Sequence, residues 1–213
     1  MLQILLILII MIIIHESGHL IASLLLKVKV EAFSIGFGRP LFKKIFKGID
    51  FRITPFLLGG YTKIRGEIDY STNGLLVQPY YKKFIIIIAG VLMNLIATAI
   101  VYLIAYKSIL TGIKVDYLFW TYTFTKDYYA IPLLLEIFKV NGFVLLFTVM
   151  NGFGALLNLL PIPALDGGYL WLYLLERFFN KKDFISFLKI MNVVGWGFLI
   201  ILQIILVYIY LVI

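Results

Sequence analysis

Two histidines and a glutamate lie within an almost purely apolar stretch near the start of the sequence. The segment HESGH places His15 and His19 four residues apart, and the chain has only these 2 histidines. On a helix, residues four apart project from one face, so both imidazoles can bind one zinc ion with Glu16 beside them as general base. Ionisable groups are costly to bury in a membrane and usually mark a functional site. The spacing therefore predicts a metal centre inside a membrane span.

A catalytic zinc ion usually has three protein ligands and an open position for water. The third candidate is Asp166, in the segment NLLPIPALDGGYL at residues 158–170. Pro161 and Pro163 are expected to break the helix before it. Unwound backbone at membrane depth is tolerated where it lines a cavity or is buried in protein. We therefore expect Asp166 on unwound chain, at a depth where it can meet both histidines.

The composition is that of an integral membrane protein. Of 213 residues, 62% are hydrophobic and 14% charged, and the mean hydropathy is +1.03. Without cysteine, any metal must be held by His, Asp, Glu or water. We predict a single α-helical membrane core over residues 1–213, whose first span is retained because it lacks the features of a cleaved signal peptide. Stretches of roughly 20 apolar residues can cross the hydrocarbon, and four are present, at about 2–26, 84–106, 133–160 and 192–213.

The basic residues predict how the chain is oriented. Of the 19 basic residues, eleven lie between the first two spans, namely Lys27, Lys29, Arg39, Lys43, Lys44, Lys47, Arg52, Lys63, Arg65, Lys82 and Lys83. Loops rich in Lys and Arg face the cytoplasm. We therefore expect a multi-pass protein of the cell membrane with both termini outside and the metal site toward the cytoplasmic side. This rule also explains the net charge of +8 without a nucleic-acid partner.

Between the first two spans, the pattern predicts a small sheet. Ile49, Phe51 and Ile53 alternate with polar residues, which is the period of a half-buried strand. Glycine-punctuated segments flank them, and we predict an antiparallel sheet or hairpin over about 31–65. Its edges must be covered by protein or line a wet cavity. The aromatic tract at 107–131 is expected to be an interfacial belt on the outer side.

Five motifs follow one another over about residues 15–170, namely HESGH, FSIGFGRP, GGYTKIRGE, AGVLMN and NLLPIPALDGG. In type and order they resemble the motifs of the site-2 protease family, the zinc intramembrane metalloproteases. The resemblance implies zinc ligands at His15, His19 and Asp166, and a catalytic glutamate at Glu16.

The resemblance also has implications for the substrate. It implies that Asn158 and Asn94 help to hold the substrate backbone, and that the 31–65 sheet receives the substrate as an added strand. Val91 stands where the family usually has proline, which leaves the role of Asn94 open. The loop between the second and third spans is too short for the PDZ domain of many bacterial members, and no CBS domain is visible. We therefore expect a minimal catalytic core.

The leading hypothesis is a zinc-dependent intramembrane endopeptidase that acts on membrane-spanning proteins or peptides in the lipid bilayer. Two other classes stay open. A metal or proton transporter is one, because ionisable groups in spans also mark ion paths, although the inverted repeats common in transporters are not apparent. A catalytically inactive membrane scaffold is the other, although a scaffold needs neither Glu16 nor three metal ligands. The sequence specifies neither the substrate nor the oligomeric state.

Overall fold

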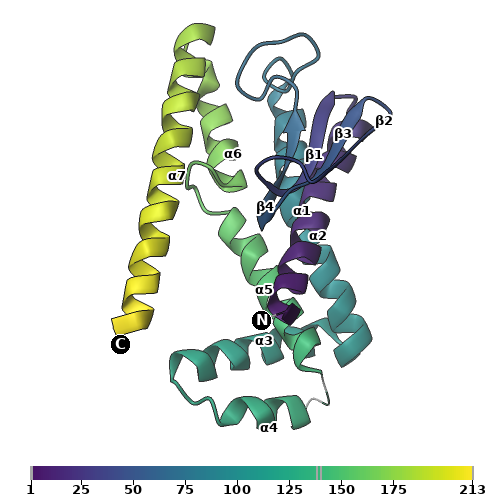
Figure 1. The fold of residues 1–213 in the computed structure, drawn as a ribbon, viewed down its shortest axis with the longest axis vertical. Coiled ribbons are helices and arrows are strands. Elements are labelled where there is room, and N and C mark those ends of the chain that lie inside the picture. The colour runs from purple at the N-terminus through teal and green to yellow at the C-terminus, as the bar shows by residue number, and fades with distance from the viewer. Residues whose placement is uncertain (1, 138, 140, 213) are drawn as a thin grey trace.

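The protein consists of apolar helices with a small sheet beside α1 at one end of the molecule (Figure 1). The structure is a computed structural model that describes residues 2–137, 139 and 141–212. Three helices are long and apolar enough to cross a membrane: α1 (Leu2–Leu25), α2 (Tyr80–Tyr106) and, over Lys181–Ile205, α7 (Lys181–Val212). A fourth candidate exists only if α4 (Ala130–Ile137) and α5 (Gly142–Asn158), which meet at 102°, form one bent span. The expected helical membrane class is therefore present, with three or four candidate spans.

Two predicted spans differ from the helices observed. The predicted span 133–160 corresponds to the bent pair of α4 and α5, and it includes residues 138 and 140, which lie outside the described residues. The predicted span 192–213 starts well inside α7 and ends on residue 213, also outside the described residues. Asn180 caps the polar first turn of α7, because its Oδ1 accepts the N–H of Asp183 at 2.9 Å. Hydropathy finds the apolar part of such a helix and misses its polar start.

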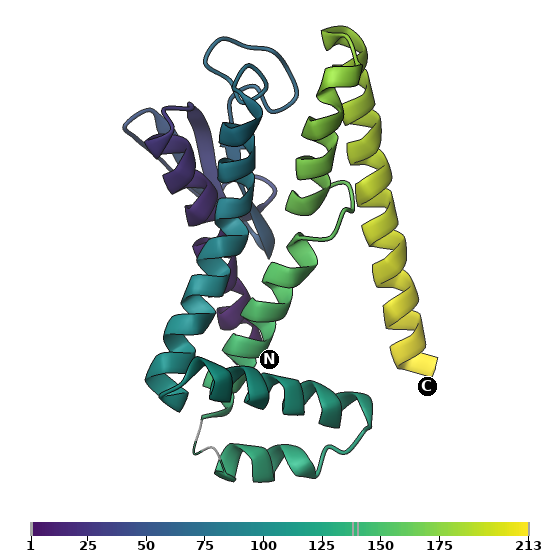
Figure 2. The same ribbon diagram turned by 180° about the vertical axis from the view of Figure 1, so that it is seen from behind.

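The aromatic tract after α2 forms a helix. α3 (Ile109–Phe124) begins after Ser108, whose hydroxyl accepts the N–H of Thr111 at 3.4 Å. α3 and α4 cross the end of the molecule toward which both termini lie (Figures 1 and 2). The sheet and the connection between the last two helices lie at the opposite end. The shared side of the two termini fits the predicted topology, whereas the side that faces the cytoplasm stays a prediction.

The sheet between α1 and α2 is mixed. Its strands are β1 (Val30–Phe37), β2 (Phe42–Phe46), β3 (Ile49–Ile53) and β4 (Phe56–Ile64), in the order β2-β3-β1-β4. The prediction of a purely antiparallel sheet was wrong, because β1 and β3 are parallel, with Phe33 opposite Phe51. The β2–β3 hairpin reverses the chain, so β3 returns beside β1 in the same direction. Alternation identifies strands but does not reveal their partners.

The sheet packs on α1, and β4 is one of its edge strands. Val30, Phe33 and Ile49 form a buried cluster with Leu20 of α1. β4 pairs with β1 along one edge, and among the described residues no strand pairs with its other edge. In Figure 1 this free edge faces α6 (Asp166–Leu175) and α7. The fold therefore sets an unpaired strand edge between the first span and the last two helices.

Candidate metal centre and active site

α1 and α2 cross at the two histidines with almost no space between them. A Cβ on Gly90 would lie 2.4 Å from His19 Nε2, and one on Gly18 would lie 2.3 Å from the carbonyl oxygen of Ala89. Glycine permits this close approach, which brings His19 Nδ1 within 2.8 Å of the Ile86 carbonyl oxygen. Because a carbonyl only accepts hydrogen bonds, Nδ1 carries the proton and Nε2 is left with a lone pair.

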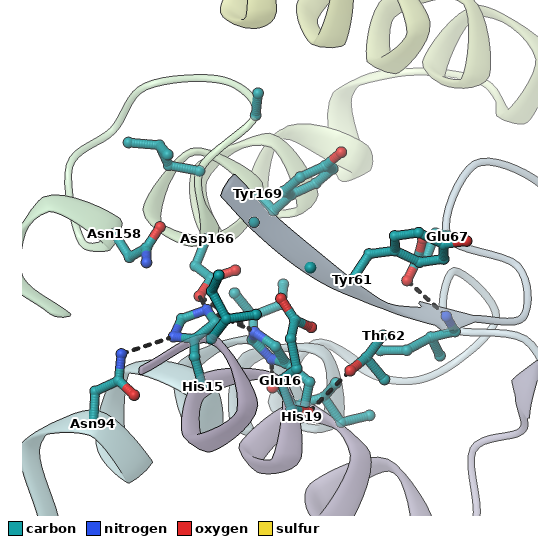
Figure 3. Close-up of a pocket in the computed structure, with 18 of the residues that line it drawn as sticks. His15, Glu16, His19, Tyr61, Thr62, Glu67, Asn94, Asn158, Asp166 and Tyr169 are labelled. Carbon is teal, nitrogen blue, oxygen red and sulfur yellow. Dashed lines mark hydrogen bonds and ion pairs between the residues drawn. The ribbon is translucent and has the colours of Figure 1, made fainter. Parts of the chain in front are cut away.

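The three predicted metal ligands converge on one point (Figure 3). His15 Nε2 and His19 Nε2 lie 3.0 and 3.4 Å from Asp166 Oδ2, and the two nitrogens are 3.2 Å apart. Ligand atoms around a tetrahedral zinc ion are separated by about 3.3 Å when its bonds are about 2.0–2.1 Å long. Asp166 Oδ2 is also buried without a hydrogen-bond donor. The donor set therefore fits zinc in both chemistry and spacing, and it is the one such cluster among the described residues.

Asp166 reaches this point from a break between two helices. α5 ends at Asn158, and residues 159–165 are unwound before α6 begins. Pro161 and Pro163 in this segment prevent α5 from continuing. Asp166 itself is the first residue of α6, so the expectation that it lies on unwound chain was wrong by one position. A carboxylate in the first turn of a helix is favoured by the helix dipole, and the helix fixes its direction.

Asn94 of α2 lies against the other histidine. It is 1% exposed, its Nδ2 is 3.4 Å from His15 Nδ1, and its Oδ1 has no donor. Turning the amide by 180° brings Oδ1 to the same ring nitrogen. Oδ1 then accepts the Nδ1 proton and leaves His15 Nε2 free for the metal, as the Ile86 carbonyl does for His19. Asn94 also lines the adjacent cavity, and its predicted contact with substrate stays a prediction.

A cavity of about 480 Å³ opens beside the ligands and is lined by Glu16, Asn158 and part of β4. β4 crosses directly over α1, since a Cβ on Gly60 would lie 2.6 Å from Ile12 Cγ2 and 3.3 Å from Glu16 Cγ. Thr62 Oγ1 donates to the Glu16 carbonyl oxygen at 2.9 Å. The strand is therefore fixed next to Glu16. Asn158 faces the same cavity from the end of α5 (Figure 3).

Comparison with known protein families gives a match over most of the chain. A family model described as Peptidase family M50 matches residues 3–202. The chain belongs to peptidase family M50. This is the site-2 protease family, so the resemblance inferred from the motifs is confirmed.

Individual M50 relatives match part of the chain. A candidate zinc metalloprotease of Campylobacter jejuni is 39% identical over 97 residues, which are 42% of this chain and 26% of the relative. One of Borreliella burgdorferi is 37% identical over 102 residues, which are 42% of this chain and 24% of the relative. The alignments thus span about a quarter of these relatives' length. Their names agree with the predicted metalloprotease class and with zinc as its metal.

The M50 motifs did not reveal an aromatic wall of the cavity. Phe37 stacks on Tyr61 with ring centroids 6.3 Å apart, and Trp196 of α7 meets Phe37 edge-on, also at 6.3 Å. All three residues line the cavity. They come from β1, β4 and α7, and no periodicity in the sequence connects these elements. Only the fold could bring them together.

Glu67 was also missed as a cavity residue of this M50 chain. It follows β4 in GGYTKIRGE and lines the cavity together with Glu16. Burial raises the pKa of Glu67 to about 7. In the sequence, Glu67 belongs to a charged segment between spans, where a carboxylate is normally solvated. The position of Glu67 directly after the strand expected to receive substrate is the sequence feature that could have identified it.

Proposed function

We propose that this chain is a zinc-dependent endopeptidase that hydrolyses peptide bonds of membrane-spanning proteins or peptides. The observation that carries this proposal is the convergence of His15, His19 and Asp166 beside Glu16, on a cavity bordered by a free strand edge. A zinc ion held by these three ligands would supply a bound water whose pKa is lowered toward 7.

Glu16 is the general base of this reaction. It neighbours His15 in sequence and lines the cavity that a substrate would enter. Its carboxylate accepts a proton from the attacking water and delivers it to the leaving amine. Its backbone is held by Thr62, so the base and the strand edge keep a fixed relation.

The free strand edge can provide hydrogen-bond partners for a membrane helix that must unwind before it is cut. Peptide groups within a helix are bonded to one another, and unwound groups at membrane depth need new partners. An unwound substrate segment can add to the free edge of β4 and bond its backbone there. The amide of Asn158, on the same cavity, can bond a further peptide group. This arrangement supports the predicted substrate class.

The orientation in the membrane follows the charge distribution. Both termini lie toward one end of the molecule, and the sheet lies at the other. The sheet segment carries most of the basic residues between the first two spans. We therefore place the termini outside and the metal site toward the cytoplasm.

Proteoliposomes with single-span peptides test the proposal. The peptides contain glycine or asparagine near the middle, so that they unwind readily, and products are identified by mass spectrometry. Wild-type protein should cut the peptides, and Glu16→Gln should keep its zinc but lose cleavage by at least about 100-fold. Normal turnover by Glu16→Gln would contradict the role of Glu16. Zinc or proton flux without cleavage would favour the transporter class.

A further inference from the structure

Glu67 makes an unusual contact with the end of β4. Its Oε1 accepts the backbone N–H of Ile64, the last residue of the strand, at 2.8 Å. The backbone carbonyl of Glu67 accepts the hydroxyl of Tyr173 on α6 at 3.2 Å. The residue is therefore tied both to β4 and to the helix that begins with Asp166.

The Ile64 N–H belongs to the free edge of β4. The next residue, Arg65, donates its N–H to the Lys29 carbonyl oxygen beside β1 at 2.8 Å. In an antiparallel pair, successive residues direct their backbone groups alternately toward the partner and away from it. Ile64, which lies opposite Val30, therefore points its N–H away from β1. The Glu67 carboxylate occupies the place that a carbonyl of an added strand would take.

The same alternation of backbone groups shows which residues of β4 remain available to pair with an added strand. Thr62, two residues before Ile64, presents its backbone groups to the same side. Its side chain is bonded to the carbonyl of Glu16, so this part of the edge has a fixed position relative to the base. Glu67 blocks the edge one pairing position beyond Thr62.

We propose that Glu67 ends the free edge of β4 at Ile64 and thereby sets the register in which a substrate strand pairs beside the metal site. This inference rests on the proposed function, because it requires a substrate that adds to β4. Glu67 is a positioning residue, which acts by limiting how far the substrate strand can slide. A strand can slip by two residues and keep the same side chains on the same face. Without the block, we expect slippage by that interval, about 6.6 Å along the strand.

The test maps the cleavage site in the single-span peptides by mass spectrometry. Wild-type protein and Glu67→Gln, which retains an acceptor at Oε1, should cut the same bond. Glu67→Ala should move the main cut by two residues, or divide it between the original bond and one two residues away. Glu67→Asp has a shorter side chain that falls short of the Ile64 amide, and it should behave like Glu67→Ala. A loss of overall fold alone does not produce a new cut at this spacing.

The matched control is Glu31→Ala. Glu31 pairs with Lys63 at 2.9 Å but lies on β1, which is an interior strand of the sheet, so its loss should leave the cut unchanged. Cleavage of only the original bond by both Glu67→Ala and Glu67→Asp would overturn the inference about register. Absence of cleavage by wild-type protein would instead overturn the proposed function.

Discussion

A backbone carbonyl and a side-chain amide are placed to decide which nitrogen each histidine offers to a metal. The Ile86 carbonyl fixes the tautomer of His19, and Asn94 is placed to do the same for His15. Groups in this position orient metal-bound histidines and raise their basicity. The spacing of His15 and His19 in HESGH was enough to predict that they bind zinc. The groups on α2 that hold the two histidines could not be predicted. The sequence does not show where a backbone carbonyl points, and a single asparagine in a span is most simply a group that hydrogen-bonds between helices.

Asn94→Ala should weaken zinc binding about 10- to 100-fold, since His15 loses the partner that holds its ring. Competition with a fluorescent zinc chelator measures the Kd directly and does not depend on activity. The control is Asn180→Ala, which removes an exposed asparagine at the start of α7 and should leave the Kd unchanged. Equal zinc affinities for Asn94→Ala and wild type would contradict the orienting role.

Among the secondary-structure elements, β4 depends on its close crossing with α1. Gly60→Val would force side-chain atoms into Ile12 and Glu16, so β4 must move away from the base. We expect cleavage in proteoliposomes to fall at least about 10-fold, because misplacement by about 1 Å can cost more than that, while zinc content stays near wild type. Gly197→Ala is the control, because a Cβ there meets no atom within 4 Å. Wild-type cleavage by Gly60→Val would show that β4 does not position substrate.

A partly buried ion pair anchors the far end of α6. Lys83 of α2 pairs with Glu176, directly after α6, and Tyr70 donates its hydroxyl to the same carboxylate at 2.7 Å. The Lys83 side chain is 4% exposed. The helix that presents Asp166 is thus held at its other end by α2. The sequence did not show this pairing, because the two residues are far apart and each lies in a basic or mixed segment.

Lys83→Met should lower the free energy of unfolding by about 3 kcal/mol, since it leaves the Glu176 charge partly buried without its partner. Unfolding of the purified protein in mixed detergent micelles measures the change. Lys82→Met, at a neighbouring and more exposed lysine, should cost less than about 1 kcal/mol. A similar loss in both variants would mean that the ion pair contributes nothing specific.

The whole molecule combines predictable and unpredictable parts. Apolar length, loop charge and the proline break predicted a helical membrane protein, its basic end and the interruption before Asp166. The paths of α3 to α5 were not predicted, because aromatic residues suit both an interfacial belt and a helix. Strand partners and the aromatic wall were also missed, since they depend on contacts between distant segments. Sequence patterns indicate the local environment of a residue, whereas tertiary packing determines which distant residues it contacts.

The packing of α3 against α2 and α5 should depend on pH through Asp116 of α3. This carboxylate accepts hydrogen bonds from Tyr102 of α2 and Thr148 of α5 at 2.6 and 2.8 Å. Burial raises the pKa of Asp116 to about 6, above the value of about 4 expected in the unfolded chain. The folded state therefore binds the proton more tightly, and stability falls as pH rises from about 4 to 6. The stability of Asp116→Asn should not fall over this pH range, as measured by thermal unfolding in detergent. The same dependence of stability on pH in Asp116→Asn and in wild type would contradict this role of Asp116.

Zinc content per chain is the most direct test of the central claim, that His15, His19 and Asp166 jointly hold the metal beside Glu16. It is measured by elemental analysis on wild-type protein, His15→Ala, Asp166→Ala and Glu16→Gln after gel filtration in detergent. We predict about one zinc ion in wild type and in Glu16→Gln, and a loss of most zinc in both ligand variants, because each leaves only two ligands. Full zinc in Asp166→Ala, or none in wild type, would contradict the proposed site.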